Sequence, residues 1–462
     1  MDPPSSGAAV GLTSNPTHGT CHKCAAPLGR GNRATARCPR CGLTYHTTDC
    51  GRTWQDLSGG IEGDHFVRAI EADPERRGLL FAGTERGLYV SFDDGKGWDP
   101  LQLDLPVVPI TDLAIAEGDL VVATQGRGFW ILDELTPLRQ LDAASHAGAT
   151  VLYAPMDATR AMGGRGRGGE PAGSNPAFGM TIDYRLATDT EDVELTIKDY
   201  DGAVIRTFTP EGEKSDGEFA AERSNVLPTG AGFHRFTWNL RATGAESFDD
   251  MILWNGGLGG PKVPPGQYRV ELTVDGETAG VSGLVLADPR SDATGMDLVE
   301  QYRFARSTGE LLTRAHKAIR DLRAAREDLE GLKGRLPESD GAEALEARID
   351  GALEVMKAVE EELYQTKNRS RQDPLNYPIR LTDKLAGVRS GALQGEFRPT
   401  DQMVAVAAEL SAAIEGALDR LAPVLGDELR GIDAAARALE TPLLRLPEAE
   451  SGEESAAEVD GD

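Results

Sequence analysis

The sequence predicts a multidomain chain in which β-structure comes first and α-structure follows. Three observations predict this order. A turn motif recurs at a spacing of about forty residues, alternating strands with Asp-Gly turns come next, and the last third keeps apolar residues at helical spacing. At 462 residues the chain is long enough for several domains.

The charge balance limits the class of partner. Asp and Glu number 75 against 48 Lys and Arg, which gives a net charge of −27. Because binding to phosphate backbones depends on clustered cations, we expect no nucleic-acid partner. No window approaches the roughly 18 apolar residues that a membrane helix needs, so we also expect no membrane span.

Residues 1–42 contain two C-x-x-C pairs, CHKC and CPRC. Each pair can place two thiolates on one metal, and four thiolates give the tetrahedral geometry that zinc favours. One interpretation is therefore a structural zinc site made by Cys21, Cys24, Cys38 and Cys41. The other is that this segment is a misread start without a defined fold. It lacks the charged and apolar regions of a secretory signal.

Residues 43–145 contain the repeated turn motif. TTDCGRTW and SFDDGKGW both fit Ser/Thr-x-Asp-x-Gly-x-x-Trp. In such a turn the hydroxyl and the Asp side chain hydrogen-bond the backbone, Gly takes a positive φ, and Trp packs below. The repeat predicts a partial β-propeller with structural turns at Asp49, Gly51, Trp54, Asp93, Gly95 and Trp98. Tyr45, His46 and Cys50 then belong in or beside a blade hairpin rather than in a metal site.

These motifs resemble the Asp-box, or bacterial neuraminidase repeat (BNR), β-propellers. GLYVSFDDGKGW, DLVVATQGRGFWILDELTPLRQL and QDPLNYPIRLTDKLAG look like the C-terminal part of a bacterial family labelled glycosyl hydrolase or sortilin-like, over about residues 43–440. CPRCGLTYHTTDC is similar to zinc-ribbon and prokaryotic RING-type segments. The propeller resemblance implies an extracytoplasmic location. A propeller closes with about six or more blades, so we expect either a truncated N-terminus or a partner chain that completes the ring.

The middle third is predicted to be β-structure after a linker. Residues 146–178 include MGGRGRGGEPAGSNPAFG, which is typical of a flexible Gly-rich linker. Residues 179–290 alternate apolar and polar side chains around the turns DYDGAV and TVDGET. This pattern predicts an immunoglobulin-like or fibronectin III-like β-sandwich.

Residues 295–440 are predicted to form an antiparallel helical bundle of three long amphipathic helices. The second connection, NRSRQDPLNYPIRLTDKLAG, either binds a ligand through its polar residues or ends one helix and caps the next, with a short helix over 379–388. Residues 446–462 are acidic and lack large apolar residues, so we expect a disordered tail.

The sequence supports a fold better than a reaction, because no carboxylate pair or sialidase-type arginine motif stands out. We expect the non-catalytic binding or assembly portion of an Asp-box propeller protein, with a glycan or protein ligand. One alternative is a glycoside hydrolase whose catalytic residues lie on missing blades. Another is a zinc-dependent interaction protein.

Overall fold

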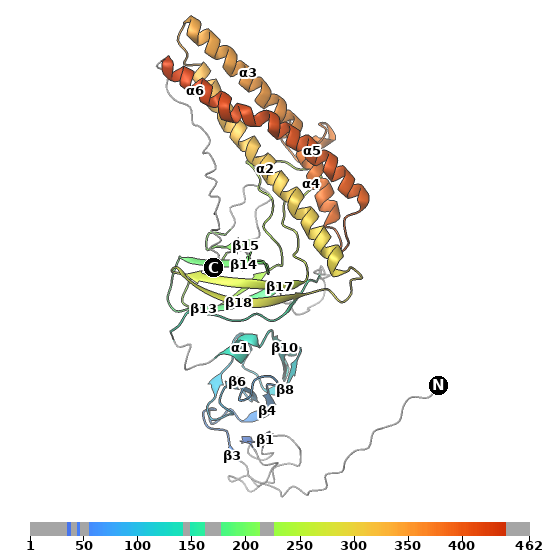
Figure 1. The fold of residues 1–462 in the computed structure, drawn as a ribbon. Coiled ribbons are helices and arrows are strands. Elements are labelled where there is room, and N and C mark those ends of the chain that lie inside the picture. The colour runs from blue at the N-terminus through green and yellow to red at the C-terminus, as the bar shows by residue number, and fades with distance from the viewer. Residues whose placement is uncertain are drawn as a thin grey trace, which may run out of the picture. The chain divides into compact units, whose positions relative to one another are not determined.

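The structure, a computed structural model, describes residues 35–37, 44–46, 55–141, 148–161, 177–212 and 226–439. The chain divides into two compact units, Met1–Ala147 and Gly148–Asp462. The first unit consists mainly of β-sheets, and the second begins with β-sheets and ends with helices (Figure 1). The predicted order of β-structure followed by α-structure is confirmed.

The described part of the first unit contains three antiparallel sheets. They are β1 (Thr35–Arg37), β2 (Thr44–His46) and β3 (Gln55–Asp56); β4 (Val67–Ala72), β5 (Leu80–Thr84), β6 (Leu88–Ser91) and β7 (Asp99–Pro100); and β8 (Ile110–Ala116), β9 (Asp119–Thr124) and β10 (Phe129–Leu132). A short helix, α1 (Thr136–Gln140), follows. Strand β1 pairs with β2 across the boundary predicted between residues 42 and 43, so this boundary was placed too late.

The second unit opens with two sheets that share one core. One sheet has the order β11 (Val151–Leu152), β13 (Met180–Leu186) and β16 (Gly232–Trp238), and the other has the order β12 (Ala158–Thr159), β18 (Glu277–Leu286), β17 (Gly266–Val274), β14 (Val193–Lys198) and β15 (Val204–Phe208). The core between them is built from alternate residues of these strands, among them Ile182, Leu195, Trp238, Val270 and Leu272. The pair β12–β18 is parallel, and the other pairs are antiparallel.

Two features of these sheets bear on the sequence predictions. The TVDGET hairpin is confirmed, because Val274 pairs with Glu277 across Asp275 and Gly276, which both have positive φ. The predicted linker began too early, because β11 and β12 lie inside 146–178. Strands of only two residues are too short to show an alternation of apolar and polar side chains, so the sequence pattern did not reveal them. Residues 162–176 of that segment lie outside the described residues.

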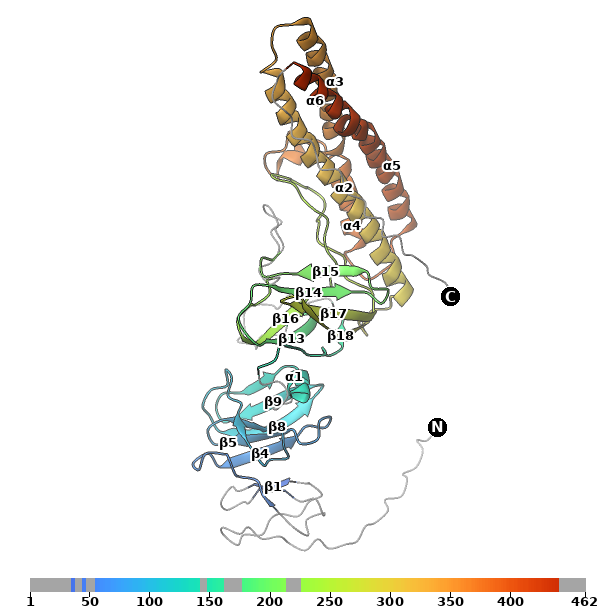
Figure 2. The same ribbon diagram turned by 60° about the vertical axis from the view of Figure 1, so that its left-hand side comes forward.

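The helices are α2 (Gly295–Lys333), α3 (Asp340–Leu363), α4 (Leu381–Ala392), α5 (Asp401–Pro423) and α6 (Leu429–Ala438). Helices α2, α3 and α5 lie side by side and bury their apolar faces in one core (Figures 1 and 2). Side-chain oxygens of Thr294, Ser339 and Thr400 cap their N-termini.

The third predicted helix is divided by a π-turn at Val424–Glu428, which directly follows Pro423. Among the described residues, no helix combines the length and apolarity needed to cross a membrane.

The connection between α3 and α4 does not cap α4 with Asn or Asp. Asp373 instead closes its own turn, because its carboxylate accepts hydrogen bonds from the backbone N–H of Arg369 (2.6 Å) and of Ser370 (2.9 Å). A 3₁₀ turn at Asp373–Leu375 follows. Arg380 precedes α4 and makes no side-chain cap.

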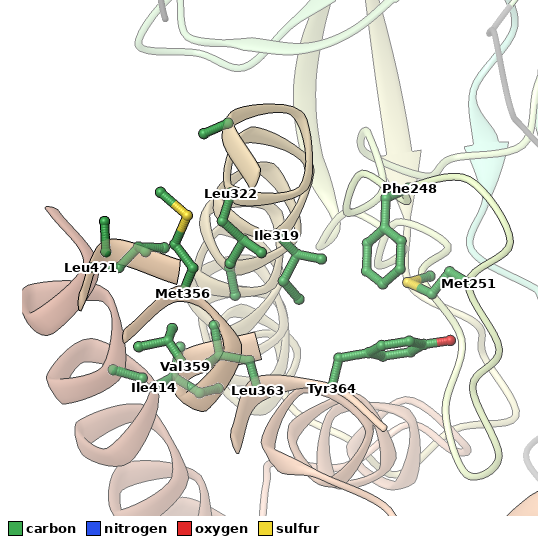
Figure 3. Close-up of a cluster of buried hydrophobic side chains, with 14 of the residues drawn as sticks. Phe248, Met251, Ile319, Leu322, Met356, Val359, Leu363, Tyr364, Ile414 and Leu421 are labelled. Atoms are coloured by element: carbon green, nitrogen blue, oxygen red, sulfur yellow. The ribbon is translucent and has the colours of Figure 1, made fainter. Parts of the chain in front are cut away.

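Residues 242–263, named here the strap, leave the sheets and lie on the helices. The sequence interpretation had placed the strap within the sandwich. Phe248, Met251, Leu253 and Leu258 of the strap belong to the helical core. Figure 3 shows Phe248 and Met251 beside Tyr364, next to Ile319 and Leu363. The strap therefore joins the β-part and the α-part of the second unit.

Helix α4 holds the strap by its backbone. The Asp383 carboxylate accepts from the N–H groups of Trp254 (2.9 Å) and Asn255 (3.0 Å). Six residues later in α4, Arg389 donates to the carbonyl oxygens of Gly257 (3.1 Å) and Gly259 (2.7 Å). The motif LTDKLAGVRSG is thus a binding site for a segment of its own chain.

Gly256 makes this close approach sterically possible. A Cβ at Gly256 would lie 2.4 Å from the Ala386 carbonyl carbon of α4. Any larger side chain there would push the strap away from the helix.

A second connection starts at Arg160, which follows β12 and is buried. Its guanidinium donates to the Val263 carbonyl (3.0 Å) and to Gln301 Oε1 of α2 (3.1 Å), and it pairs with Glu396. The Gln301 amide in turn donates to the carbonyls of Ala392 (2.8 Å) and Gly395 (2.7 Å). The strap and the Arg160 network together explain why sheets and helices form one compact unit instead of the two separate domains predicted.

Buried His316 of α2 makes the stability of the second unit dependent on pH. Its Nδ1–H donates to the Glu246 carbonyl of the strap (2.6 Å), and burial lowers its pKa to about 4. The unfolded chain takes up this proton below about pH 6.5, whereas the folded chain resists it until about pH 4. Stability is therefore complete above pH 6.5 and falls by about 3 kcal/mol as the pH drops to 4.

Urea unfolding of the wild type and of His316→Gln, followed by circular dichroism at several pH values, measures this effect. The difference in unfolding free energy between the two proteins is expected to shrink by about 3 kcal/mol between pH 7 and pH 4, because glutamine does not titrate. A constant difference across that range would show that His316 is not buried in its neutral form.

Candidate interaction surface

Several residues that the sequence singled out lie outside the described residues. They are Cys21, Cys24, Cys38 and Cys41 of the zinc interpretation and Asp49, Gly51 and Trp54 of the first turn motif. The strands on either side of that first motif are described. Strand β2 contains Tyr45 and His46 and pairs with β3, so the motif connects two antiparallel strands. The second motif has the same place, between β6 and β7.

The second turn motif is held by its own side chains. Ser91 Oγ donates to Asp93 Oδ1 (2.9 Å) and accepts from the Gly95 N–H (2.8 Å), and Asp93 Oδ1 accepts from the Gly97 N–H (2.9 Å). Gly95 has a φ of +82°, and a Cβ there would lie 2.6 Å from Leu57 Cδ1. Slight desolvation opposes ionisation of Asp93, but the hydrogen bonds from Gly97 and Ser91 keep its pKa below the ordinary value.

Trp98 ends the motif and covers one face of the sheet β4–β7. Its side chain is 6% exposed, and its Nε1–H donates to the Leu57 carbonyl (2.7 Å). It packs in a cluster with Leu57, Val67, Leu80, Ala82 and Tyr89. The turn therefore completes a hydrophobic layer through Trp98, while the polar groups of the turn hydrogen-bond to one another.

Both faces of the sheet β4–β7 are buried. Residues Leu80, Ala82 and Tyr89 face the Trp98 cluster, whereas the residues between them face the sheet β8–β10. That second layer contains Phe81, Leu88, Val90, Leu113, Leu120 and Val122. This sheet is thus a middle layer, and its strands accordingly read as continuous apolar runs.

The sheet β8–β10 has the same two-faced composition, but the described residues cover only one of its faces. Leu120 and Val122 of β9 face the shared layer. The alternate residues lie on the opposite face, where Phe129 is 78% exposed and Ile131 is 57% exposed. Their cross-strand partners Ala123 and Val121 are apolar as well. We name this face, formed by Asp112, Ala114, Val121, Ala123, Phe129 and Ile131, the outer face; the exposed Asp112 is its one charged member.

This sheet is also one strand narrower than its neighbour. The sheet β4–β7 has four strands, whereas β8–β10 has three. Within the described residues β10 pairs with β9 alone, so its other edge presents backbone N–H and C=O groups to any added strand. Strand β10 therefore contributes both to the exposed apolar face and to the open edge of this sheet.

The sequence contained a signal for this surface that the interpretation did not use. DLVVAT and GFWIL are nearly continuous apolar runs instead of alternating ones. Such runs indicate strands that are buried on both faces. The structure shows that only one of these faces is covered by described residues.

Glu62, Asp64 and His65 are the described residues grouped closely enough to hold a metal ion, with ligand atoms within 4.8 Å of one another. The two carboxylates are exposed. His65 Nδ1 is hydrogen-bonded to the Tyr89 hydroxyl (2.8 Å), and Asp64 pairs with Arg86 (3.1 Å). Since Arg86 already neutralises Asp64, we assign no metal to this cluster. Zinc at Cys21, Cys24, Cys38 and Cys41 stays a prediction.

Comparisons with protein-family models and with curated proteins find no match to this chain. Among solved structures, the chain is similar to one described as the extracellular domain of the hybrid two component system BT4673 from B. thetaiotaomicron. The match has 9% sequence identity and a TM-score of 0.16, and it covers 53% of this chain and 29% of that chain. The chain thus spans less than a third of that structure, and a likeness at this TM-score supports no conclusion about fold or function.

Proposed function

We propose that this chain is the non-catalytic assembly portion of an Asp-box β-propeller protein, and that its outer face receives a further propeller sheet. The single observation that carries the proposal is the exposure of Phe129 and Ile131 on a sheet whose opposite face is buried. Large contiguous apolar patches on a folded surface mark interaction sites.

The neighbouring sheet indicates what the missing partner is. The sheet β4–β7 covers one face of β8–β10 through side chains from alternate positions of its strands. A second sheet of the same kind would cover the outer face in the same way, and a fourth strand would pair with β10. This stacking of sheets is the arrangement of propeller blades. The partner sheet belongs to another part of the propeller, in a separate chain or in the same polypeptide.

The chemistry of the outer face favours a protein ligand over a glycan. Five of its six members are aliphatic or phenylalanine side chains without hydrogen-bonding groups, and Asp112 on β8 is the one polar member. A sugar needs several polar partners that fix its hydroxyls. We also infer that the two sheets of residues 148–286 are the immunoglobulin-like sandwich that accompanies such a propeller.

Sedimentation velocity over a concentration series tests the proposal. An uncovered apolar face with an open strand edge is expected to make the isolated chain self-associate. The double variant Phe129→Ser and Ile131→Ser is expected to be monomeric. Its unfolding free energy should stay within about 0.5 kcal/mol of the wild type, because both side chains are exposed.

A matched control removes equally exposed apolar side chains elsewhere in the first unit. Leu103 and Val107 are 69% and 72% exposed and lie outside the sheet. The double variant Leu103→Ser and Val107→Ser should associate like the wild type. A wild type that is monomeric at every concentration, or two double variants that behave alike, would contradict an assembly role for the outer face.

A further inference from the structure

A second candidate site lies in the other unit, between α2, α5 and the strap. It is a hollow of about 580 Å³ whose lining includes Arg389 of α4, Arg306 and Arg314 of α2, and Ser411 of α5. Arg389 is 1% exposed, so it lies at the buried end of the hollow. Gly309 of α2 makes room for it, since a Cβ there would lie 3.3 Å from Arg389 Nε.

Among the described residues, no acidic side chain pairs with Arg389. Its guanidinium donates hydrogen bonds to three backbone carbonyls, those of Gly257, Gly259 and Ala305. Carbonyl oxygens carry only partial charges, and a guanidinium has five N–H groups, so charge and donors are left over. Buried Arg160 differs, because it pairs with Glu396. Burial, together with nearby Arg241 and Arg306, lowers the pKa of Arg389 to about 10.

The remaining charges around the hollow compensate one another. Arg306 pairs with Glu310 (3.2 Å), and Arg314 pairs with Glu415. These two acids are the carboxylates in the lining. Subtracting two paired acids from three arginines leaves one positive charge, that of Arg389, in a chain whose net charge is −27. A buried cation without a counter-charge is costly, and a bound anion would remove that cost.

We propose that this hollow binds a small oxyanion, a phosphate, sulfate or carboxylate group, with Arg389 as its buried counter-ion and Arg306 and Arg314 at its rim. Arginine suits this role because its planar fork donates two parallel hydrogen bonds to such groups. The Ser411 hydroxyl of the lining supplies a further donor, whereas the hydroxyls of Thr243, Ser307 and Thr308 already donate to backbone carbonyls. The site is independent of the outer face in the first unit.

Titration calorimetry of the full chain with inorganic phosphate, sulfate or acetate at constant ionic strength tests this site. Ser411→Glu places a carboxylate inside the hollow, where it competes with the anion. We expect the Kd for the preferred anion to rise by at least about tenfold. Ala412→Glu adds the same charge at the next, exposed position of α5, outside the lining, and should bind like the wild type. Arg306→Gln should weaken binding without unfolding the protein, because this side chain lies at the rim.

The three anions show whether the hollow prefers a tetrahedral oxyanion or a carboxylate. Binding of phosphate or sulfate indicates a tetrahedral oxyanion, and binding of acetate alone indicates a carboxylate. Absence of binding by all three anions would overturn the proposal and leave Arg389 as a clamp for the strap. Equal affinities in Ser411→Glu and Ala412→Glu would overturn it as well, since binding would then lie elsewhere.

Discussion

Replacing Arg389 with methionine is expected to lower the unfolding free energy of the second unit by about 3–5 kcal/mol. Methionine retains much of the volume but none of the donors. The carbonyls of Gly257, Gly259 and Ala305 would then lose their charge-assisted hydrogen bonds. Because Arg389 is buried between the strap and the helices, these carbonyls would be left without a partner from the protein.

Urea unfolding followed by far-UV circular dichroism measures this change, since α2 to α6 all lie in the second unit. Arg430→Met is the matched control. Arg430 is exposed and pairs with Asp427, three residues before it. Such surface pairs contribute about 0–1 kcal/mol. Similar losses in both variants would mean that the strap is not held by the Arg389 bonds.

Replacing Trp98 with alanine is expected to lower the stability of the first unit by about 3–5 kcal/mol. The substitution removes a large buried side chain from the cluster that covers one face of the sheet β4–β7. It also removes the indole donor to the Leu57 carbonyl. The remaining members of the cluster, among them Leu57, would then cover this face of the sheet only in part.

Hydrogen exchange of the β5 amides measures the effect, because β5 is an interior strand of that sheet. Trp130→Ala is the control. Trp130 is 37% exposed and lies outside the described hydrophobic clusters, so its removal should cost no more than about 1 kcal/mol. Equal acceleration of β5 exchange in both variants would show that Trp98 does not close the layer.

The features that the sequence predicts well depend on local chemistry. Ser91, Asp93 and Gly95 act within eight residues of chain, and Asp275–Gly276 specifies its hairpin through two positive φ angles. The long helices have sustained apolar spacing and capping residues such as Thr294. In each case the determining atoms are close neighbours in the sequence.

The features that the sequence interpretation missed depend on distant contacts. From the sequence alone, an arginine at this helix position is predicted to be exposed. Arg389 is buried because the strap, some 130 residues earlier in the chain, covers it. The strap contains five glycines between 244 and 260, which resemble a loop. Only the structure shows why glycine is needed there, for example where the backbone at Gly256 packs against Ala386 of α4. The outer face was missed for a related reason, because periodicity does not tell which of two apolar faces is covered.

The central claim is that the outer face receives another Asp-box sheet, and site-specific photo-cross-linking tests it most directly. A benzoylphenylalanine at Ile131 is compared with one at Val107, in cells that produce this chain. The proposal predicts cross-links from Ile131, absent from Val107, to a polypeptide segment that contains Ser/Thr-x-Asp-x-Gly-x-x-Trp motifs. Cross-links to the second unit of this same chain, to a protein without such motifs, or equally from both positions would contradict it.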